Sequence, residues 1–354
     1  MTRALLLSAF VSLSAHAAET MRVSMGDPVA KAVVEAPGLE AGEDVDDAGF
    51  TALEGAKATL RWQGGQVWVG GQAKGPSLRL RAEGQGALTV NGTRVRGEVA
   101  VVGSPQGLVL VNVIALEDYL KGVLGSEMPP QFPLEALKAQ AVAARTYALE
   151  RKLEMLGQPF HLGSSVLSQV YGGLAAEDPR TQEAVEATRG EVLTFQLQPI
   201  EAYFHASCGG KTESGLQALG RDLPYLKPVS CPCGKLPNSK WTLELSEGDA
   251  KTALKASSLS VQGRTPTGRA RRVELGAGRS VDAVTFRERL GYAKVKSLWF
   301  DVEPKGHGWK LEGKGFGHGA GLCQWGAKVL AEQGQGYREI LEHYYPGTEL
   351  QVLY

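Results

Sequence analysis

The sequence has no excess of charge of either sign and, beyond its first residues, no long apolar run. Its 38 Lys and Arg balance 38 Asp and Glu, so nothing points to nucleic-acid binding, which requires a basic surface. Beyond residue 17 no segment reaches about 18 uncharged apolar residues, so we expect no transmembrane segment in the mature chain. Cysteine is scarce, with four residues in 354.

The first residues have the pattern of an export signal. Arg3 precedes an apolar run over residues 4–13 that is too short to span a bilayer, and residues 15–17 (Ala-His-Ala) form an A-x-A cleavage site. The alternative is an N-terminal strand or helix of the fold itself. The pattern favours a signal peptide over residues 1–17 and a protein exported to the periplasm or cell envelope.

Glycine is abundant, with 45 residues, which favours turns and strands over a helical bundle. Residues 18–106 show short apolar alternations, and Asn91-Gly92 predicts a hairpin between two of them. We therefore expect a β-rich N-terminal region over residues 18–106.

Residues 107–354 have a mixed pattern that predicts an α+β core with one long helix. A buried strand is expected over 107–114 and a short helix over 116–123. The long helix is expected over 134–155, with a stripe of small apolar residues that lets another element pack closely. Later elements are strands over 191–195 and 200–205 and helices over 321–333 and 337–344.

Glu127 is the first candidate for chemistry. It is expected in a break between two helices, flanked by Met128, two prolines and Phe132. An apolar wall raises the pKa of a carboxyl, as a general acid near neutral pH requires. The alternative is a Glu that only caps the next helix.

No second carboxylate motif accompanies Glu127, although most glycosidases use two. One reaction class needs only one, because the 6-hydroxyl of muramic acid can attack its own anomeric carbon. A single Glu could then protonate the leaving oxygen and later accept the hydroxyl proton. That reaction is lytic transglycosylation, which leaves a 1,6-anhydro end.

Other polar residues have competing interpretations. Arg145, in the long helix, could tie that helix to a loop carbonyl or contact substrate or Glu127. Ser207 with His205 could form a nucleophile and base, but no G-x-S-x-G elbow surrounds the serine. Cys208 with a distant His318 could form a thiol hydrolase, although an oxidising compartment disfavours a free thiolate.

Glycine occupies every second position from 313 to 321. On an extended strand this leaves one face as bare backbone, which a ligand or another strand can approach closely. His318 would then lie on the other face, available to a site as a substrate-binding residue or buried in a packed core. Neither a Walker loop nor a Rossmann glycine pattern is present.

The four cysteines allow two interpretations. Export favours disulfides, and two bridges from Cys231 and Cys233 to Cys208 and Cys323 would avoid a strained bridge between near neighbours. A zinc site built from all four is the alternative, although C-x-C is not the common C-x₂-C spacing.

Several long motifs follow one another from about residue 107 onward. They include L-E-D-Y-L-K-G-V and S-E-M-P before and around Glu127, A-V-A-A-R-T-Y around Arg145, and Q-V-Y-G-G around Tyr171. The later ones are A-T-R-G, H-A-S-C-G-G-K-T-E, G-F-G-H-G-A-G-L-C-Q-W-G-A and H-Y-Y-P-G-T, which lie over residues 187–190, 205–213, 315–327 and 343–348. In this order the motifs resemble the stage II sporulation protein D family, also called the LytB amidase-enhancer family.

The resemblance implies lytic transglycosylase activity on peptidoglycan glycan, with preference for strands stripped of stem peptides. It places the catalytic acid at Glu127 and the family's helical arginine at Arg145, and it puts Tyr171, Lys211 and Glu213 in a substrate groove. The other activity in the family name, enhancement of a cell-wall amidase, implies a binding module with an amidase partner.

One stretch departs from the family. Some members have a His/Cys cluster between the long helix and Q-V-Y-G-G that can hold zinc, whereas residues 160–168 of this sequence retain only His161. We therefore expect no metal at that place and no cofactor required for activity, with zinc at the four cysteines as the one possible exception.

Overall fold

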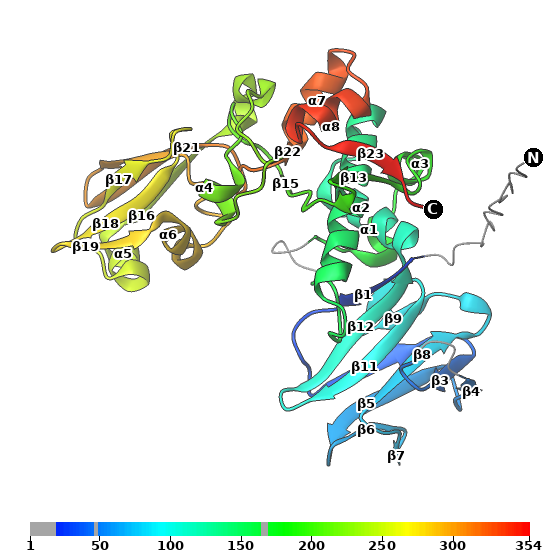
Figure 1. Ribbon diagram of the computed structural model, residues 1–354. Coiled ribbons are helices and arrows are strands. Elements are labelled where there is room, and N and C mark those ends of the chain that lie inside the picture. Colours follow the sequence, from blue (N-terminus) through cyan, green and yellow to red (C-terminus); the bar gives the residue numbers. More distant parts are fainter. Residues whose placement is uncertain (1–18, 46–48, 164–168) are drawn as a thin grey trace, which may run out of the picture. The chain divides into compact units, whose positions relative to one another are not determined.

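The computed structural model describes residues 19–45, 49–163 and 169–354, and the predicted signal peptide lies outside them. These residues form two compact units (Figure 1). The first comprises described residues up to Tyr119 together with Tyr354, and the second runs from Leu120 to Leu353. The α+β class predicted from sequence is confirmed.

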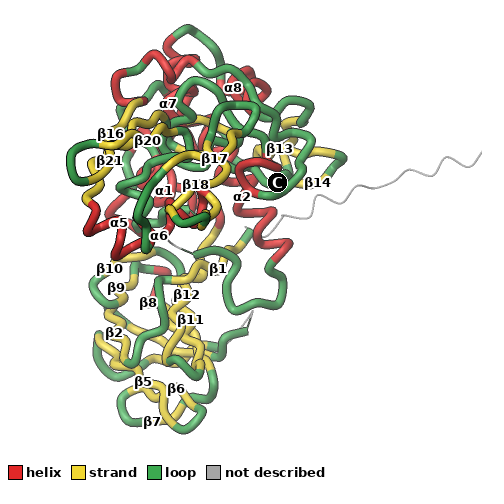
Figure 2. Tube along the Cα trace, turned by 90° about the vertical axis from the view of Figure 1, so that its left-hand side faces the viewer, coloured by secondary structure: helices red, strands yellow, loops and turns green. Residues whose placement is uncertain are grey.

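The first unit is built almost entirely from strands, as Figure 2 shows for the segment from β1 to β12. The strands are β1 (Thr20–Ser24), β2 (Lys31–Glu35), β3 (Leu39–Gly42), β4 (Phe50–Ala52), β5 (Lys57–Gln63), β6 (Gln66–Val69), β7 (Gln72–Ala73), β8 (Ser77–Ala82), β9 (Leu88–Val90), β10 (Thr93–Val95), β11 (Glu98–Ser104) and β12 (Gly107–Ala115), with the 3-10 helix η1 (Glu83–Gln85) after β8.

These strands form two antiparallel sheets, in the orders β1-β12-β11-β8-β3-β4 and β10-β9-β2-β5-β6-β7. The sheets contact each other at Gly103 of β11, where an added Cβ would come 1.9 Å from the Trp62 ring of β5. The hairpin predicted at Asn91-Gly92 is confirmed: both residues have positive φ and join β9 to β10. The first unit extends past residue 106 because β12 pairs with both β11 and β1.

The second unit contains the long helix and the later elements. They are α1 (Leu116–Glu127), which begins in the first unit, α2 (Leu134–Glu154), η2 (Gly173–Ala176), α3 (Pro179–Ala187), β13 (Glu191–Phe195), β14 (Gln198–Pro199), β15 (Phe204–His205), α4 (Gly215–Leu219), η3 (Pro232–Lys235), η4 (Pro237–Ser239), β16 (Lys240–Ser246), α5 (Glu247–Leu254), β17 (Ser260–Arg264), β18 (Ala270–Gly276), β19 (Arg279–Asp282), α6 (Ala283–Leu290), β20 (Phe300–Pro304), β21 (Gly308–Lys314), β22 (Leu322–Cys323), α7 (Gln324–Glu332), α8 (Tyr337–Tyr344) and β23 (Glu349–Val352).

Helix α2 is the centre of this unit. Its residues from Ala136 to Leu149 are buried with one exception, Lys138, and it packs against α3, α7, α8 and β13. Six of these buried residues are alanines, so neighbouring elements can approach on several sides, as the predicted small stripe indicated. Among the described residues, no helix has both the length and the apolar character that a membrane span needs.

Two small antiparallel sheets, β16-β21-β20 and β17-β18-β19, share a core with α5 and α6. Phe286 and Phe300 stack in this core with ring centroids 5.6 Å apart. A third sheet, β14-β13-β23, joins the middle of the chain to residues 349–352.

Three local predictions need correction. The strand expected over 200–205 is present only at Phe204–His205, and the helix expected over 321–333 begins at Gln324. The glycine-rich run is no regular strand beyond Lys314, because Gly315, Gly317, Gly319 and Gly321 all have positive φ.

Candidate functional site

Glu127 is the last residue of α1, rather than a residue in a break between helices. The helix continues to this position because the first proline comes only at 129, so all of residues 116–127 can keep helical backbone. Met128 and Phe132, the predicted apolar neighbours, are buried. The side chain of Glu127 is half-buried.

Among the described residues, two groups adjoin the Glu127 carboxyl. Its Oε1 accepts a hydrogen bond of 2.8 Å from the backbone N–H of Val170. The side chain of Gln324, on the first turn of α7, also adjoins the carboxyl and stabilises its ionised form. That contact is loose, since Nε2 of Gln324 is buried and makes no hydrogen bond of good geometry within the described residues.

Burial raises the pKa of Glu127 above its ordinary value, and the contacts with Val170 and Gln324 only partly oppose the rise. The direction agrees with the prediction from the apolar flanks. Within the described part of the chain, no other carboxylate contributes to this pKa. Among the described residues, Glu127 therefore has no second carboxylate acting on it.

The segment that carries Val170 lies directly against α1. A Cβ on Gly122 would come 2.8 Å from the Tyr171 ring, and a Cβ on Gly125 would come 1.8 Å from the carbonyl oxygen of Ala176. Any larger residue at either position would push the segment away. Gln169 fastens its other side, because its buried Nε2 donates to the carbonyl oxygen of Ala144 in α2 at 3.0 Å.

The residue that follows Gln324 belongs to an aromatic pair. Trp325 follows Gln324, and its half-buried ring meets the ring of Phe132 edge-on with centroids 4.9 Å apart. The backbone N–H of Trp325 donates to the carbonyl oxygen of Ala206 at 3.0 Å, which fixes the first turn of α7. Neither Gln324 nor Trp325 was assigned a role from sequence.

Arg145 lies apart from the Glu127 carboxyl contacts. It is fully buried, and its guanidinium donates to the carbonyl oxygens of Val185 at 3.1 Å and Glu191 at 3.2 Å. These bonds tie α2 to the end of α3 and the start of β13, which is the structural interpretation left open for this residue. A role for Arg145 in substrate binding stays a prediction.

Lys211 and Glu213 lie in the segment after β15. Lys211 is exposed, whereas Glu213 is buried and accepts hydrogen bonds from the hydroxyls of Thr265, at 2.6 Å, and Thr267. Arg269 completes this network, with Nη1 at 3.7 Å from the Glu213 carboxylate. The assignment of Lys211 and Glu213 to a substrate groove stays a prediction.

His318 lies within the same region, since Glu213 donates its backbone N–H to the carbonyl oxygen of Gly319. Its Nδ1 accepts the N–H of Ala320 at 3.1 Å, so Nε2 carries the proton and donates to the carbonyl oxygen of Phe204 at 2.9 Å. Burial lowers the pKa of His318 to about 4, so the ring is neutral near neutral pH. With Glu213 and Arg269 it lines a small cavity of about 280 Å³.

The two hydrolase alternatives find no support in the geometry. His205 bonds to the carbonyl oxygen of Ala320 through Nδ1, and its Nε2 has no partner among the described residues, so it does not activate Ser207. Cys208 is buried among other sulfur atoms, and burial raises the pKa of its thiol well above the ordinary value. A nucleophilic thiol needs the opposite shift.

The cysteines contain no disulfide in this structure: all four are free and buried, and their sulfur atoms lie within 4.8 Å of one another. Cys208, Cys231, Cys233 and Cys323 therefore converge as the sequence predicted, but not in bonded pairs. In the stretch 160–168, where some family members have a His/Cys cluster, His161 is buried. Residues 164–168 of that stretch lie outside the described residues.

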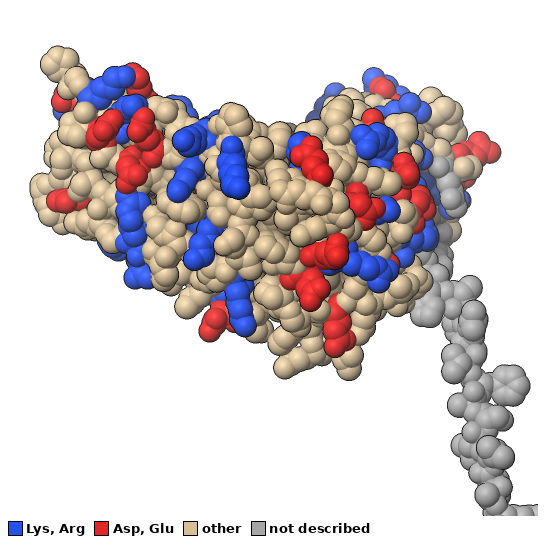
Figure 3. Space-filling model, turned by 90° about the horizontal axis from the view of Figure 1, so that it is seen from above, with Lys and Arg blue, Asp and Glu red and all other residues tan. Residues whose placement is uncertain are grey.

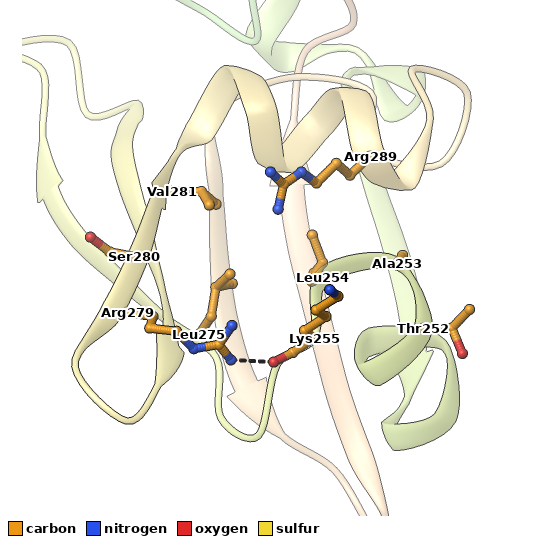
Figure 4. Close-up of a pocket in the computed structure, with 9 residues that line it drawn as sticks. All are labelled: Thr252, Ala253, Leu254, Lys255, Leu275, Arg279, Ser280, Val281 and Arg289. Carbon is orange, nitrogen blue, oxygen red and sulfur yellow. Dashed lines mark hydrogen bonds between the residues drawn. The ribbon is translucent and has the colours of Figure 1, made fainter.

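A separate pocket of about 570 Å³ lies between α5, β18, β19 and α6 (Figure 4). Lys255, Arg279 and Arg289 are among its nine lining residues, and Arg279 donates to the carbonyl oxygen of Lys255. None of the predicted site residues lines it. The face drawn in Figure 3 carries both basic side chains (Lys and Arg) and acidic ones (Asp and Glu), as expected for a chain with balanced charge.

Comparisons with known proteins bear on the region around Glu127. Residues 104–195 match the family described as Stage II sporulation protein. Stage II sporulation protein D of Bacillus subtilis is 33% identical over 262 residues, which cover 68% of this chain and 75% of that protein. An uncharacterized protein of Brachyspira hyodysenteriae is 35% identical over 277 residues, 76% of this chain and 75% of its own. An amidase enhancer of Bacillus subtilis is 31% identical over 290 residues, 65% of this chain and 40% of the enhancer.

Proposed function

Because the chain belongs to the stage II sporulation protein D family, we propose that it is an exported lytic transglycosylase that cleaves the glycan strands of peptidoglycan. The observation that carries the proposal is the carboxyl of Glu127, whose pKa is raised by burial and to which no second carboxylate of the described residues contributes. Ordinary glycosidases place two carboxyl groups about the scissile bond. A single acid suits a reaction in which the substrate supplies its own nucleophile.

The proposed reaction uses Glu127 twice. The protonated carboxyl gives its proton to the glycosidic oxygen as the bond between that oxygen and C1 of the muramic acid residue breaks. The 6-hydroxyl of the same sugar then bonds to C1 and releases its proton to the Glu127 carboxylate. The acid is restored, no water is consumed, and the products are a free 4-hydroxyl and a 1,6-anhydromuramic end.

The surroundings of Glu127 favour a glycan as substrate. The Val170 N–H orients the carboxyl, so its second oxygen is the one to approach the scissile bond. The rings of Trp325 and Tyr171 are half-buried, and such amphipathic rings can cover the apolar face of a sugar. We further propose that strands stripped of stem peptides are preferred and that the protein acts in the periplasm or cell envelope.

The test compares wild type with Glu127→Gln on peptidoglycan that an amidase has stripped of peptides. The products are examined by mass spectrometry for 1,6-anhydromuramic ends. Glu183→Gln is the matched control, since Glu183 is an exposed carboxylate on α3. We expect new anhydro ends from wild type and Glu183→Gln and none from Glu127→Gln. Equal ends from all three, or none from any, would overturn the proposal.

The likeness to an amidase enhancer supports a second candidate, in which the protein binds glycan and stimulates a separate cell-wall amidase. The two functions separate at Glu127, because a binding module does not need its proton. If Glu127→Gln makes no anhydro ends but stimulates amidase digestion as strongly as wild type does, both functions coexist. If wild type makes no such ends yet stimulates the amidase, only the second function holds.

A further inference from the structure

Four sulfur atoms meet in one buried place. They come from three separate stretches of chain: the segment that follows β15, the turn that begins η3, and the junction of β22 with α7. Every pair of the four lies within 4.8 Å. We name this group the cysteine cluster: Cys208, Cys231, Cys233 and Cys323.

The spacing suits one tetrahedral ion. With zinc–sulfur bonds of about 2.3 Å, tetrahedral geometry places the sulfur atoms about 3.8 Å apart. Sγ of Cys208 is 3.3 Å from Sγ of Cys233, and no pair exceeds 4.8 Å. Small adjustments would bring all four to a common centre. An iron–sulfur cluster holds its thiolates on different iron atoms, so it needs a wider arrangement.

Hydrogen-bond donors surround the sulfur atoms. Sγ of Cys323 accepts the backbone N–H groups of Cys208 and Gly326, both at 3.3 Å. The hydroxyl of Ser207 donates to Sγ of Cys233 at 3.6 Å. Oη of Tyr344 lies 3.2 Å from Sγ of Cys231. Donors of this kind stabilise the charge of metal-bound thiolates, and the uncharged sulfur of a disulfide has little need of them.

A helix N-terminus and an arginine place positive charge beside the cysteine cluster. Cys323 is the N-cap of α7, so the positive end of that helix faces its sulfur. Arg269 donates to the carbonyl oxygen of Cys208 at 2.9 Å. Four thiolates around one Zn²⁺ leave a net negative charge, which these groups offset.

Close backbone packing keeps the cluster compact. A Cβ on Gly326 would come 2.4 Å from Sγ of Cys231 and 2.0 Å from Oη of Tyr344. A Cβ on Gly234, which follows Cys233, would come 2.8 Å from the Cα of Gly210. The turn around Cys231 and Cys233 therefore fits against α7 only with glycine at 326, and against the turn after Cys208 only with glycine at 234.

From this convergence we propose that the cysteine cluster binds one Zn²⁺ through four thiolates, as a closed structural site. The ion joins the segment after β15, η3 and the start of α7, none of which adjoins another in the sequence. It also fixes the first turn of α7, where Gln324 follows Cys323 directly and adjoins Glu127. This last consequence rests on the proposed function, whereas the metal site does not.

The test uses the full chain, purified without chelator, and reads metal rather than activity. Elemental analysis should find one zinc per chain. Replacement by Co²⁺ should give thiolate-to-cobalt charge-transfer bands together with the visible bands of tetrahedral Co²⁺. Under denaturing, non-reducing conditions, alkylation should label all four cysteines.

Two disulfides would leave no alkylated cysteine and a chain mass four hydrogens below the reduced form, and that result would overturn the proposal. Iron in place of zinc, or four free thiols that take up neither Zn²⁺ nor Co²⁺, would overturn it as well. Cys323→Ser should bind less than a tenth of the wild-type metal. If that variant does not fold, Tyr344→Phe, which keeps every ligand, should retain zinc but release it at least several times faster to a chelator.

Discussion

The backbone N–H of Val170 donates to Oε1 of Glu127 at 2.8 Å, although the two residues are 43 positions apart in the sequence. This bond fixes one oxygen of the carboxyl, and the proposed reaction would use the other. The segment that provides it stays in place because Gly122 and Gly125 give it a surface without side chains. The orientation of the Glu127 carboxyl therefore depends on Gly122 and Gly125 as well as on Val170.

Gly125→Ala tests that dependence. The added methyl would overlap the carbonyl oxygen of Ala176, so we expect the free energy of unfolding to fall by about 1–3 kcal/mol. The activity on glycan of the protein that remains folded should fall as well. Urea unfolding and anhydro-end formation would measure both. Gly248→Ala, in α5, is the control, because its Cβ meets only Ser246 Oγ at 3.8 Å. The control should be neutral or more stable by up to about 1 kcal/mol. Equal effects of the two changes would contradict a role of Gly125 in holding the segment that orients Glu127.

Gln324→Met tests the second contact of Glu127. The side chain of Gln324 lowers the pKa of Glu127, so its loss should raise that pKa further. The general acid would then stay protonated to higher pH, and the alkaline limb of the kcat/KM profile should move upward. Gln333→Met, at the exposed end of the same helix, should leave the profile unchanged. An alkaline limb at the same pH in both variants would show that Gln324 does not act on Glu127.

Arg145→Ala tests the structural role of the buried arginine. The change leaves a cavity and removes one hydrogen-bond donor each from the carbonyl oxygens of Val185 and Glu191. We expect a loss of about 3–5 kcal/mol in the free energy of unfolding. Arg189→Ala, at an exposed ion pair with Glu186, should cost less than about 1 kcal/mol. Denaturant titration would measure both losses. A small loss of stability in Arg145→Ala, together with a raised KM in glycan digestion, would instead favour the substrate-binding prediction.

Glu150 gives a prediction for pH. Burial, joined by the charges of Glu201 and Glu154, raises its pKa to about 7. The folded chain therefore holds a proton that the unfolded chain loses near pH 4.5, so stability falls as pH rises from about 4.5 through 7. Glu150→Gln should raise the Tm relative to wild type at pH 8 and much less at pH 5. A Tm difference that does not change with pH, as expected for Glu183→Gln, would contradict this.

Elements with a strong local pattern were predictable from sequence. The long helix was expected over 134–155 and spans Leu134–Glu154, because its alanines and long side chains favour helix at every position. The turn at Asn91-Gly92 was predictable because few other pairs adopt positive φ at both positions. The raised pKa of Glu127 followed from its apolar neighbours.

The contacts of the site were not predictable in this way. Gln324 reaches Glu127 only through the packing of α7 beside α2, a long-range arrangement with no periodic signal in the sequence. Its motif was matched to the family, but nothing in C-Q-W-G gives the glutamine a role. The four glycines after Lys314 indicated close approach correctly, yet alternation alone suggested a flat strand. At Gly321 glycine is required twice over, because φ is positive and a Cβ would come 2.0 Å from the carbonyl oxygen of Tyr203.

The pairing of β13 with β23 has a consequence for how the protein is made. Thr194 lies opposite Glu349, 155 residues further along the chain, so β13 has no partner on that side until residues 349–352 have been synthesised. Until then its backbone groups on that edge are open to other strands, a condition that invites aggregation. A chain that stops short of residue 349 would leave this edge open permanently. Truncated chains would thus keep an unpaired β13 edge that quality-control proteases can recognise, even when α2 and its helical neighbours are complete.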